Sequence, residues 1–182
     1  MPRTFLSATI LTSCLTLGTA YADDKDALIK DALSAASPEI AQTAMVMDWD
    51  NSMLKNGTGP YTCMPTPPDI RAKGGKNPMC LDKVWQAWGD AWMHKKPFKA
   101  QAVGIAFMLA GDTGASNIDP YATAGTPTNQ WIVEGPHLMM IVPDTAQLEA
   151  LPTDPHNGGP YVMWKGTPYV HIMVPVAERP KQ

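Results

Sequence analysis

The sequence predicts an α+β domain in which N-terminal helices and a tryptophan-striped helix pack on an antiparallel sheet of about four strands. Two observations predict this class. Helical patterns dominate the first half of the chain, whereas strand patterns gather in the second half with one short helix between them. No internal repeat is long enough to indicate a solenoid.

The N-terminus has the pattern of a secretory signal peptide over residues 1–22. Arg3 supplies a positive charge, an apolar stretch runs from Phe5 to Leu17, and Ala20-Tyr21-Ala22 fits a small-x-small cleavage site. That stretch is too short to cross a bilayer and no later segment reaches the necessary length, so we expect no transmembrane segment. Cleavage after Ala22 would leave residues 23–182 as a single domain, periplasmic or secreted.

Processing has one alternative. Leu11-Thr12-Ser13-Cys14 resembles the lipobox of bacterial lipoproteins, in which the cysteine becomes the lipidated N-terminus. The apolar run before Cys14 would be very short, and Leu15-Thr16-Leu17 continues the signal core. Cleavage after Ala22 is therefore favoured over lipid anchoring at Cys14.

The charge balance argues against polyanionic partners. Removing Arg3 from the fourteen basic side chains leaves thirteen, against seventeen acidic ones. Nucleic acid and anionic membrane surfaces attract basic proteins, so we expect neither as a partner. A small ligand or a metal ion remains compatible with this composition.

Two cysteines stay in the mature chain, and export favours a disulfide between them. Cys63 and Cys80 lie near the two ends of a long irregular loop at about 56–79, which is rich in Gly, Pro, Thr and Lys. A disulfide between these two cysteines would connect the two ends of the loop. The alternative, a redox or copper-binding dithiol, lacks the C-x-x-C spacing.

Helices are predicted over residues 23–36, 38–47, 81–96 and 144–151. Ser37 and Pro38 form a typical start for the second of them. In the third, Trp85, Trp88 and Trp92 recur at helical spacing. Such a stripe can form a platform for sugars or aromatic ligands, but the core face of an amphipathic helix is the favoured interpretation.

Strands are predicted over residues 103–109, 131–142 with a break at Gly135-Pro136, 161–164 and 169–176. The last two flank Lys165-Gly166-Thr167-Pro168 and form a candidate hairpin.

Two of these strands place a histidine two residues before a methionine, as His137-Leu138-Met139 and His171-Ile172-Met173. Residues i and i+2 of a strand share a face, so each histidine stands beside its methionine. In the last strand Val170, Ile172, Val174 and Val176 form an aliphatic face, which we expect to be the core side. The His-Met faces would then point away from the core.

Neighbouring antiparallel strands would bring two imidazoles and two thioethers into one patch. Soft thioethers with imidazoles suit Cu(I), or Cu(II) through the nitrogens, so copper is the candidate cofactor. The candidate metal site is His137, Met139, His171 and Met173. The His171-x-Met173 pair also resembles the ligand pair of periplasmic copper chaperones, over those three residues only.

The alternative is that these side chains simply fill the core. Methionines are spread along the mature chain, which is typical of core packing, and histidines in apolar strands are often hydrogen-bonded in the interior.

A second candidate site is the polar loop that follows the predicted strand over 103–109. Its candidate ligand-binding residues are Asp112, Ser116, Asn117 and Asp119, whose oxygens could hold Ca²⁺ or a polar substrate. The spacing does not match a calcium-binding loop, and the same residue types are common in turns. Turn formation is the favoured interpretation.

Enzyme signatures are mostly absent from the sequence. No nucleophile elbow, H-E-x-x-H motif or phosphate-binding glycine loop occurs. A non-catalytic binding protein is therefore favoured. The alternatives are a small-molecule hydrolase-like enzyme that uses a histidine with the Asp112–Asp119 loop, and a structural envelope protein without a ligand.

Two longer segments carry a family resemblance. Pro78-Met79-Cys80-Leu81-Asp82 with the tryptophan helix, and the run from Gly158 to Tyr169, resemble a family of exported bacterial hypothetical proteins of unknown function. The resemblance spans most of the mature chain. It implies export and supplies no activity.

Overall fold

The computed structural model describes residues 17–180, with side chains from residue 24 onward. Residues 1–16 of the predicted signal peptide, Cys14 among them, lie outside the described residues, and cleavage after Ala22 stays a prediction. The helices are α1 (Leu17–Leu33), α2 (Pro38–Thr43), α3 (Pro68–Arg71), α4 (Lys83–Met93) and the 3-10 helix η1 (Thr145–Leu148). Within residues 17–180 no helix has the length and apolar character needed to span a membrane.

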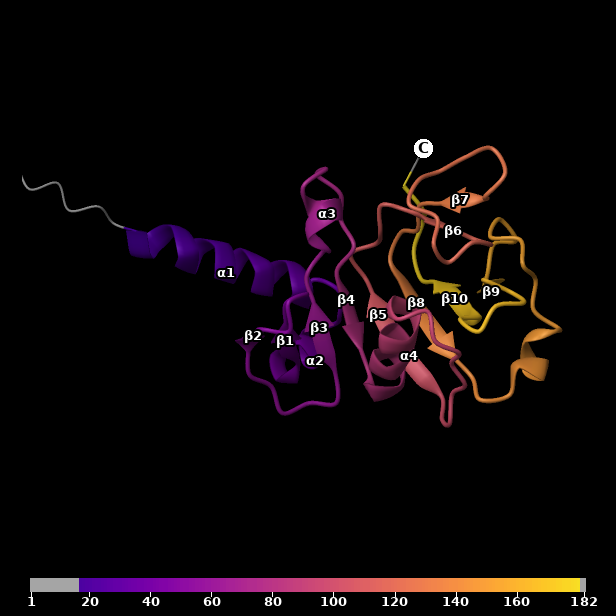
Figure 1. The fold of residues 1–182 in the computed structure, drawn as a ribbon, viewed down its shortest axis with the longest axis horizontal. Coiled ribbons are helices and arrows are strands. Elements are labelled where there is room, and N and C mark those ends of the chain that lie inside the picture. The colour runs from indigo at the N-terminus through magenta and orange to yellow at the C-terminus, as the bar shows by residue number, and fades with distance from the viewer. Residues whose placement is uncertain (1–16, 181–182) are drawn as a thin grey trace, which may run out of the picture.

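The main sheet has eight strands in the order β2-β1-β3-β4-β5-β8-β10-β9, and β6 and β7 form a separate pair (Figure 1). The strands are β1 (Met45–Met47), β2 (Met53–Lys55), β3 (Thr62–Met64), β4 (Met79–Leu81), β5 (Gly104–Met108), β6 (Ala115–Ser116), β7 (Trp131–Ile132), β8 (His137–Ile141), β9 (Tyr161–Met163) and β10 (His171–Pro175). The α+β class is confirmed. The predicted count of about four strands was wrong.

The additional strands escaped prediction because they are short. β1 to β4 have three residues each, too few to display a period of two. β1 occupies a segment predicted as the end of a helix, and β3 and α3 lie inside the segment 56–79 predicted as irregular. The neighbours β1 and β3 run parallel, so the sheet is antiparallel with one exception.

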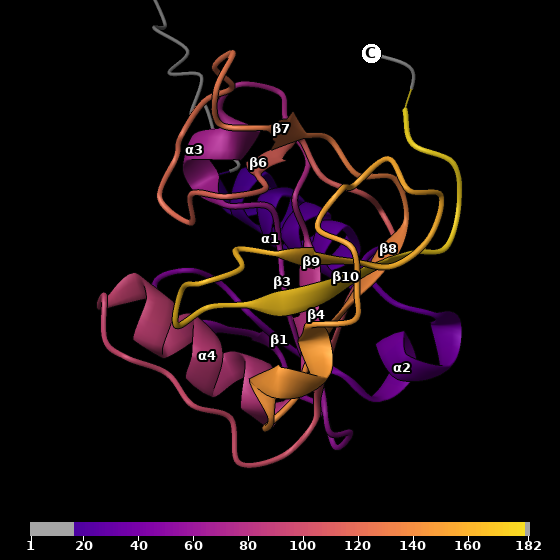
Figure 2. The ribbon, with the colours of Figure 1, turned by 90° about the vertical axis from the view of Figure 1, so that its right-hand side faces the viewer.

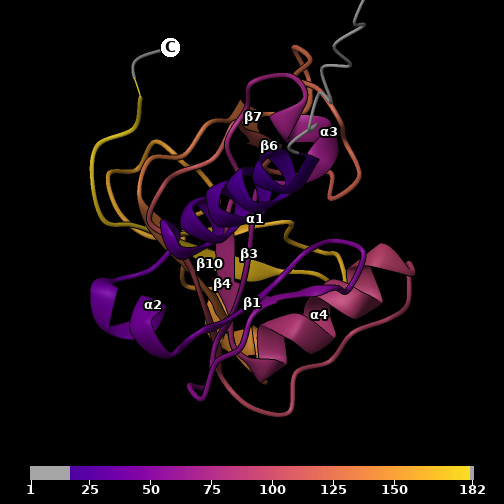
Figure 3. The same ribbon diagram turned by 90° about the vertical axis from the view of Figure 1, so that its left-hand side faces the viewer.

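The two long helices cover different faces of the sheet. The buried cluster under α1 contains Cys63, Cys80 and Val46, whereas the cluster under α4 contains Leu81 and Ala106. Because successive strand residues point to opposite faces, α1 and α4 pack on opposite faces. Figure 3 shows α1 lying across β3 and β4, and α4 and α2 lie on opposite sides of the strands in both side views (Figure 2, Figure 3).

Cys63 and Cys80 are directly paired residues of β3 and β4, with an S–S distance of 1.98 Å. The predicted cysteine pair is therefore at bonding distance. Its two sulfurs are buried beneath α1, where Val46 and Ala32 pack around them.

Helix α4 sits close to the sheet because of its N-cap and one glycine. The Asp82 carboxylate accepts hydrogen bonds from the backbone N–H of Trp85 at 2.9 Å and of Ile105 at 2.6 Å, which ties the helix start to β5. A Cβ on Gly104 would lie 2.8 Å from the Val84 side chain, so only glycine permits this approach. The helix ends at Met93, three residues before the predicted end.

Candidate functional site

A pocket of about 500 Å³ lies between α4, the sheet face beneath it and the loop that follows β5. All four residues of the predicted metal site line it, and so do Asp112, Ser116 and Asp119 of the second predicted site. Two candidate sites that the sequence kept apart thus share one pocket. The size is within the range of small-ligand sites, about 300–1,000 Å³.

The two His-x-Met strands are neighbours. β8 and β10 pair antiparallel, with Met139 directly opposite Met173. On the outer sides, His137 is opposite Met108 of β5 and His171 is opposite Met163 of β9. Directly paired residues share a sheet face, with Cβ atoms about 5 Å apart.

The expectation that the His-Met faces point away from the core was wrong. His137 is 0 % exposed and His171 is 2 % exposed, while Ile172 and Val174 on the other face stay partly exposed. The His171 ring is nearly perpendicular to the rings of Trp85, Trp88 and Trp164, at centroid distances of 5.0–5.7 Å. Alternation separates two apolar faces but does not say which one a helix covers.

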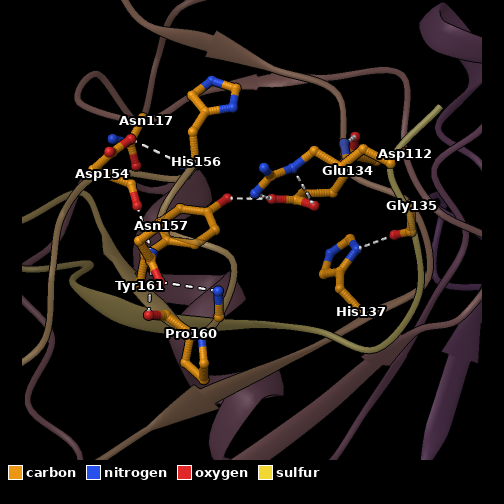
Figure 4. Close-up of polar contacts among 12 residues, drawn as sticks. Asp112, Asn117, Glu134, Gly135, His137, Asp154, His156, Asn157, Pro160 and Tyr161 are labelled. Atoms are coloured by element: carbon orange, nitrogen blue, oxygen red, sulfur yellow. Dashed lines mark hydrogen bonds and ion pairs between the residues drawn. The ribbon is translucent and has the colours of Figure 1, made fainter. Parts of the chain in front are cut away.

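Both histidines are held in the same tautomer. His137 Nδ1 lies 2.8 Å from the carbonyl oxygen of Gly135 (Figure 4), and His171 Nδ1 lies 2.9 Å from that of Tyr169. A carbonyl oxygen can only accept, so each Nδ1 carries the hydrogen and each Nε2 keeps its lone pair. His137 Nε2 has no hydrogen-bond partner among the described residues.

Burial keeps these imidazoles neutral. It lowers the pKa of His171 to about 4 and lowers that of His137 as well. A metal ligand must be unprotonated, and ligating histidines usually donate their other N–H to a carbonyl or carboxylate. The two histidines already have this arrangement.

The methionines that look scattered in the sequence converge in the fold. Eight of the chain's twelve line this pocket: Met47, Met64, Met79, Met93, Met108, Met139, Met163 and Met173. Met93 is 55 % exposed, so the pocket reaches the surface at the end of α4. The spread of methionines along the sequence therefore no longer argues against a metal site in this pocket.

The polar side chains of the second predicted site make most of their hydrogen bonds within their own loop. The Ser116 hydroxyl donates to the Asn129 carbonyl and accepts from the N–H of Asp119, and the Asp119 carboxylate accepts from the N–H of Tyr121. The Asn117 amide donates to Gln130 and Thr153 and does not line the pocket. These contacts are typical of turn formation.

A buried charged cluster beside His137 was missed by sequence analysis (Figure 4). Glu134, 1 % exposed, receives two hydrogen bonds from Arg179, at 2.6 and 3.0 Å, and one from the Tyr161 hydroxyl at 2.7 Å. The backbone N–H of Glu134 donates to the Asp112 carboxylate at 2.9 Å. The one available signal was a lone glutamate in an apolar segment, which calls for a partner.

The raised pKa of the Asp112 carboxyl should make the stability of the protein depend on pH. Burial raises the pKa of its carboxyl from 3.8 to about 7, and the Glu134 charge contributes. Its stabilising contribution is therefore complete below about pH 4 and lost as the pH rises through 7. Asp112→Asn removes the charge and keeps an acceptor for the Glu134 N–H. We expect it to raise the free energy of unfolding at pH 8 by on the order of 2 kcal/mol and to change it little at pH 4.

Urea unfolding at pH 4, 6 and 8 measures this difference. Asp119→Asn, which removes an exposed carboxyl from the same loop, is the matched control. An effect of Asp112→Asn that is the same at all three pH values would contradict the assignment.

Over residues 17–180, three or more His, Cys, Asp or Glu side chains nowhere gather to hold an ion, in this pocket or elsewhere. Comparison with protein-family models, curated proteins and solved structures finds no match to this chain. The functional conclusion therefore rests on the geometry of the pocket.

Proposed function

We propose that this chain is an exported binding protein that holds a soft metal ion, Cu(I), in the pocket beneath α4. The observation that carries the proposal is the pair of buried histidines, each with Nδ1–H directed to a backbone carbonyl, which line one pocket together with methionine side chains. Imidazole and thioether form a soft ligand set, which prefers Cu(I) to harder ions. Zinc sites usually add thiolate or carboxylate ligands, and here both mature cysteines are at disulfide distance.

Burial suits this ion. Cu(I) carries one charge and tolerates an apolar, thioether-rich environment that would repel strongly hydrated divalent ions. The tryptophans of α4 close the pocket over the sheet, and the opening at Met93 gives an entry path past another thioether. The predicted signal peptide and the cysteine pair support an oxidising, extracytoplasmic location.

Anaerobic titration of the mature protein with Cu(I), in competition with a chromophoric Cu(I) chelator, tests the proposal. We expect stoichiometric binding, and a loss of affinity of at least about 100-fold in His137→Ala/His171→Ala, because residues that bind the ion directly contribute more than the groups that orient them. His94→Ala/His156→Ala removes two surface histidines and should leave the affinity within about twofold.

Circular dichroism of each variant checks that the variant remains folded. Unchanged Cu(I) affinity in the folded double variant of His137 and His171 contradicts the proposal. Equal loss in the His94 and His156 control would do the same, since it would place the binding on the surface.

One observation favours a second function, a small-molecule enzyme. The pocket joins Asp112 and Asp119 to both histidines, which is the arrangement that the hydrolase-like alternative requires. However, both histidine Nδ1 atoms contact backbone carbonyls rather than carboxylates. The acid-base partner that a catalytic histidine normally has is therefore replaced, and metal binding is the better-supported function.

A further inference from the structure

We infer that the pocket contains two copper half-sites related by a local two-fold axis, so that one chain binds two Cu(I) ions. This inference rests on the proposed function. It starts from the register of β8 and β10, in which Met139 and Met173 are direct partners. An antiparallel pair has a local two-fold axis perpendicular to the sheet, and here the axis passes between these two methionines.

The axis relates the two histidines to each other. Each lies two residues before the central methionine of its own strand, and each donates Nδ1–H to the carbonyl oxygen two residues before itself, at 2.8 Å for His137 and 2.9 Å for His171. The same hydrogen bond thus orients both rings. Side chains that only fill the core would not need matching orientations.

The relation extends to the outer strands. His137 has Met108 of β5 directly opposite, and His171 has Met163 of β9 directly opposite. β5 and β9 flank the central pair on its two sides, so the axis also exchanges these methionines. Each half-site therefore has one imidazole, one thioether across the neighbouring strand and one thioether two residues along its own strand.

The same register separates the two half-sites. The Met139–Met173 pair lies between the histidines, which are offset by four residues along the strands. At about 3.3 Å per residue the two Cα atoms are offset by roughly 13 Å. Directly paired residues have Cβ atoms about 5 Å apart, so the register places each histidine nearer to the methionine opposite it than to the other histidine.

The surroundings of the half-sites differ. His137 lies beside the Glu134–Arg179 cluster, whereas His171 is enclosed by tryptophan rings. We therefore expect two binding steps of unequal affinity rather than one cooperative step. The three indole rings around His171 lie at centroid distances of 5.0–5.7 Å, whereas His137 has the charged cluster as its neighbour.

Native mass spectrometry of the mature protein loaded anaerobically with Cu(I) tests the stoichiometry. We expect two ions per chain in the unmodified protein and one ion in His137→Ala, in His171→Ala, in Met108→Leu and in Met163→Leu. Methionine to leucine conserves volume and should preserve the fold. Met140→Leu, in β8 but on the opposite sheet face, should still bind two ions.

X-ray absorption of the His137→Ala and His171→Ala proteins adds an independent readout. Each remaining site should show one nitrogen and about two sulfur scatterers. The outcomes separate the two proposals. No copper binding at all overturns the proposed function, while a single ion abolished by either histidine variant leaves that function standing and overturns the two-site arrangement.

Discussion

Trp88→Ala is expected to lower the free energy of unfolding by about 4 kcal/mol, the largest effect of any single replacement considered. Trp88 is the centre of the aromatic cluster that joins α4 to the sheet. Its ring contacts five others, those of Trp85, Trp92, Trp164, Tyr169 and His171, at centroid distances of 4.8–6.3 Å. Truncation removes these contacts and leaves a cavity beside an existing pocket, where the surroundings cannot collapse to fill it.

Urea denaturation followed by far-ultraviolet circular dichroism measures the loss. Trp88→Phe is the matched variant: it keeps an aromatic ring and should lose less than about 2 kcal/mol. A loss below about 1 kcal/mol in Trp88→Ala would mean that α4 is not packed on the sheet through this residue, and the enclosed pocket would no longer be supported.

Glu134→Ala is expected to lower the free energy of unfolding by about 3 kcal/mol. The replacement leaves the Tyr161 hydroxyl buried without an acceptor and Arg179 without its carboxylate. Breaking one side of a buried ion pair usually destabilises by about 3–5 kcal/mol, and we take the lower end because the Arg179 side chain is 24 % exposed.

A double-mutant cycle isolates the pair. Arg179→Met alone should lose less than Glu134→Ala because part of the arginine side chain is hydrated. Glu134→Ala/Arg179→Met removes both charges and should lose less stability than the sum of the two single losses, because neither charge is left without its partner. If the two single losses simply add in the double variant, the hydrogen-bonded ion pair contributes nothing, and the C-terminal segment is held by other contacts.

Local patterns predicted the elements that are long enough to show their period. The tryptophan spacing placed α4 within three residues at each end, and the apolar run over 103–109 became β5. The break at Gly135-Pro136 indeed separates β7 from β8, and the predicted hairpin strands pair as β9 and β10. These features depend on residues close together in the chain, so local propensity and periodicity decide them.

The three-residue strands could not be predicted in the same way. β1 and β3 are recognisable as strands only through their pairing, β1 with β3 and β3 with β4, because three residues are too few to show a period. Likewise, Glu134 and Arg179 are 45 residues apart, and no local signal connects them. Such elements depend on tertiary pairing that overrides local preference.

The residues of the proposed metal site were identified in part from the sequence. The sequence alone identified the two histidines and their i+2 methionines, because strand geometry puts those pairs on one face whatever the fold. It did not identify Met108 and Met163, which become partners of the histidines only through the register of β5 and β9. It also assigned the wrong face to the core, because thioether and aliphatic faces are both apolar.

What the sequence determined by itself is therefore the α+β class, the tryptophan helix, the cysteine pair and the fact that each histidine stands beside one methionine. The tertiary structure decided that the two His-Met strands are neighbours, that eight methionines surround one pocket and that α4 covers the histidine face. The reason is physical. Residues near in the chain are related by fixed backbone geometry, whereas strand register and helix packing depend on contacts between distant segments.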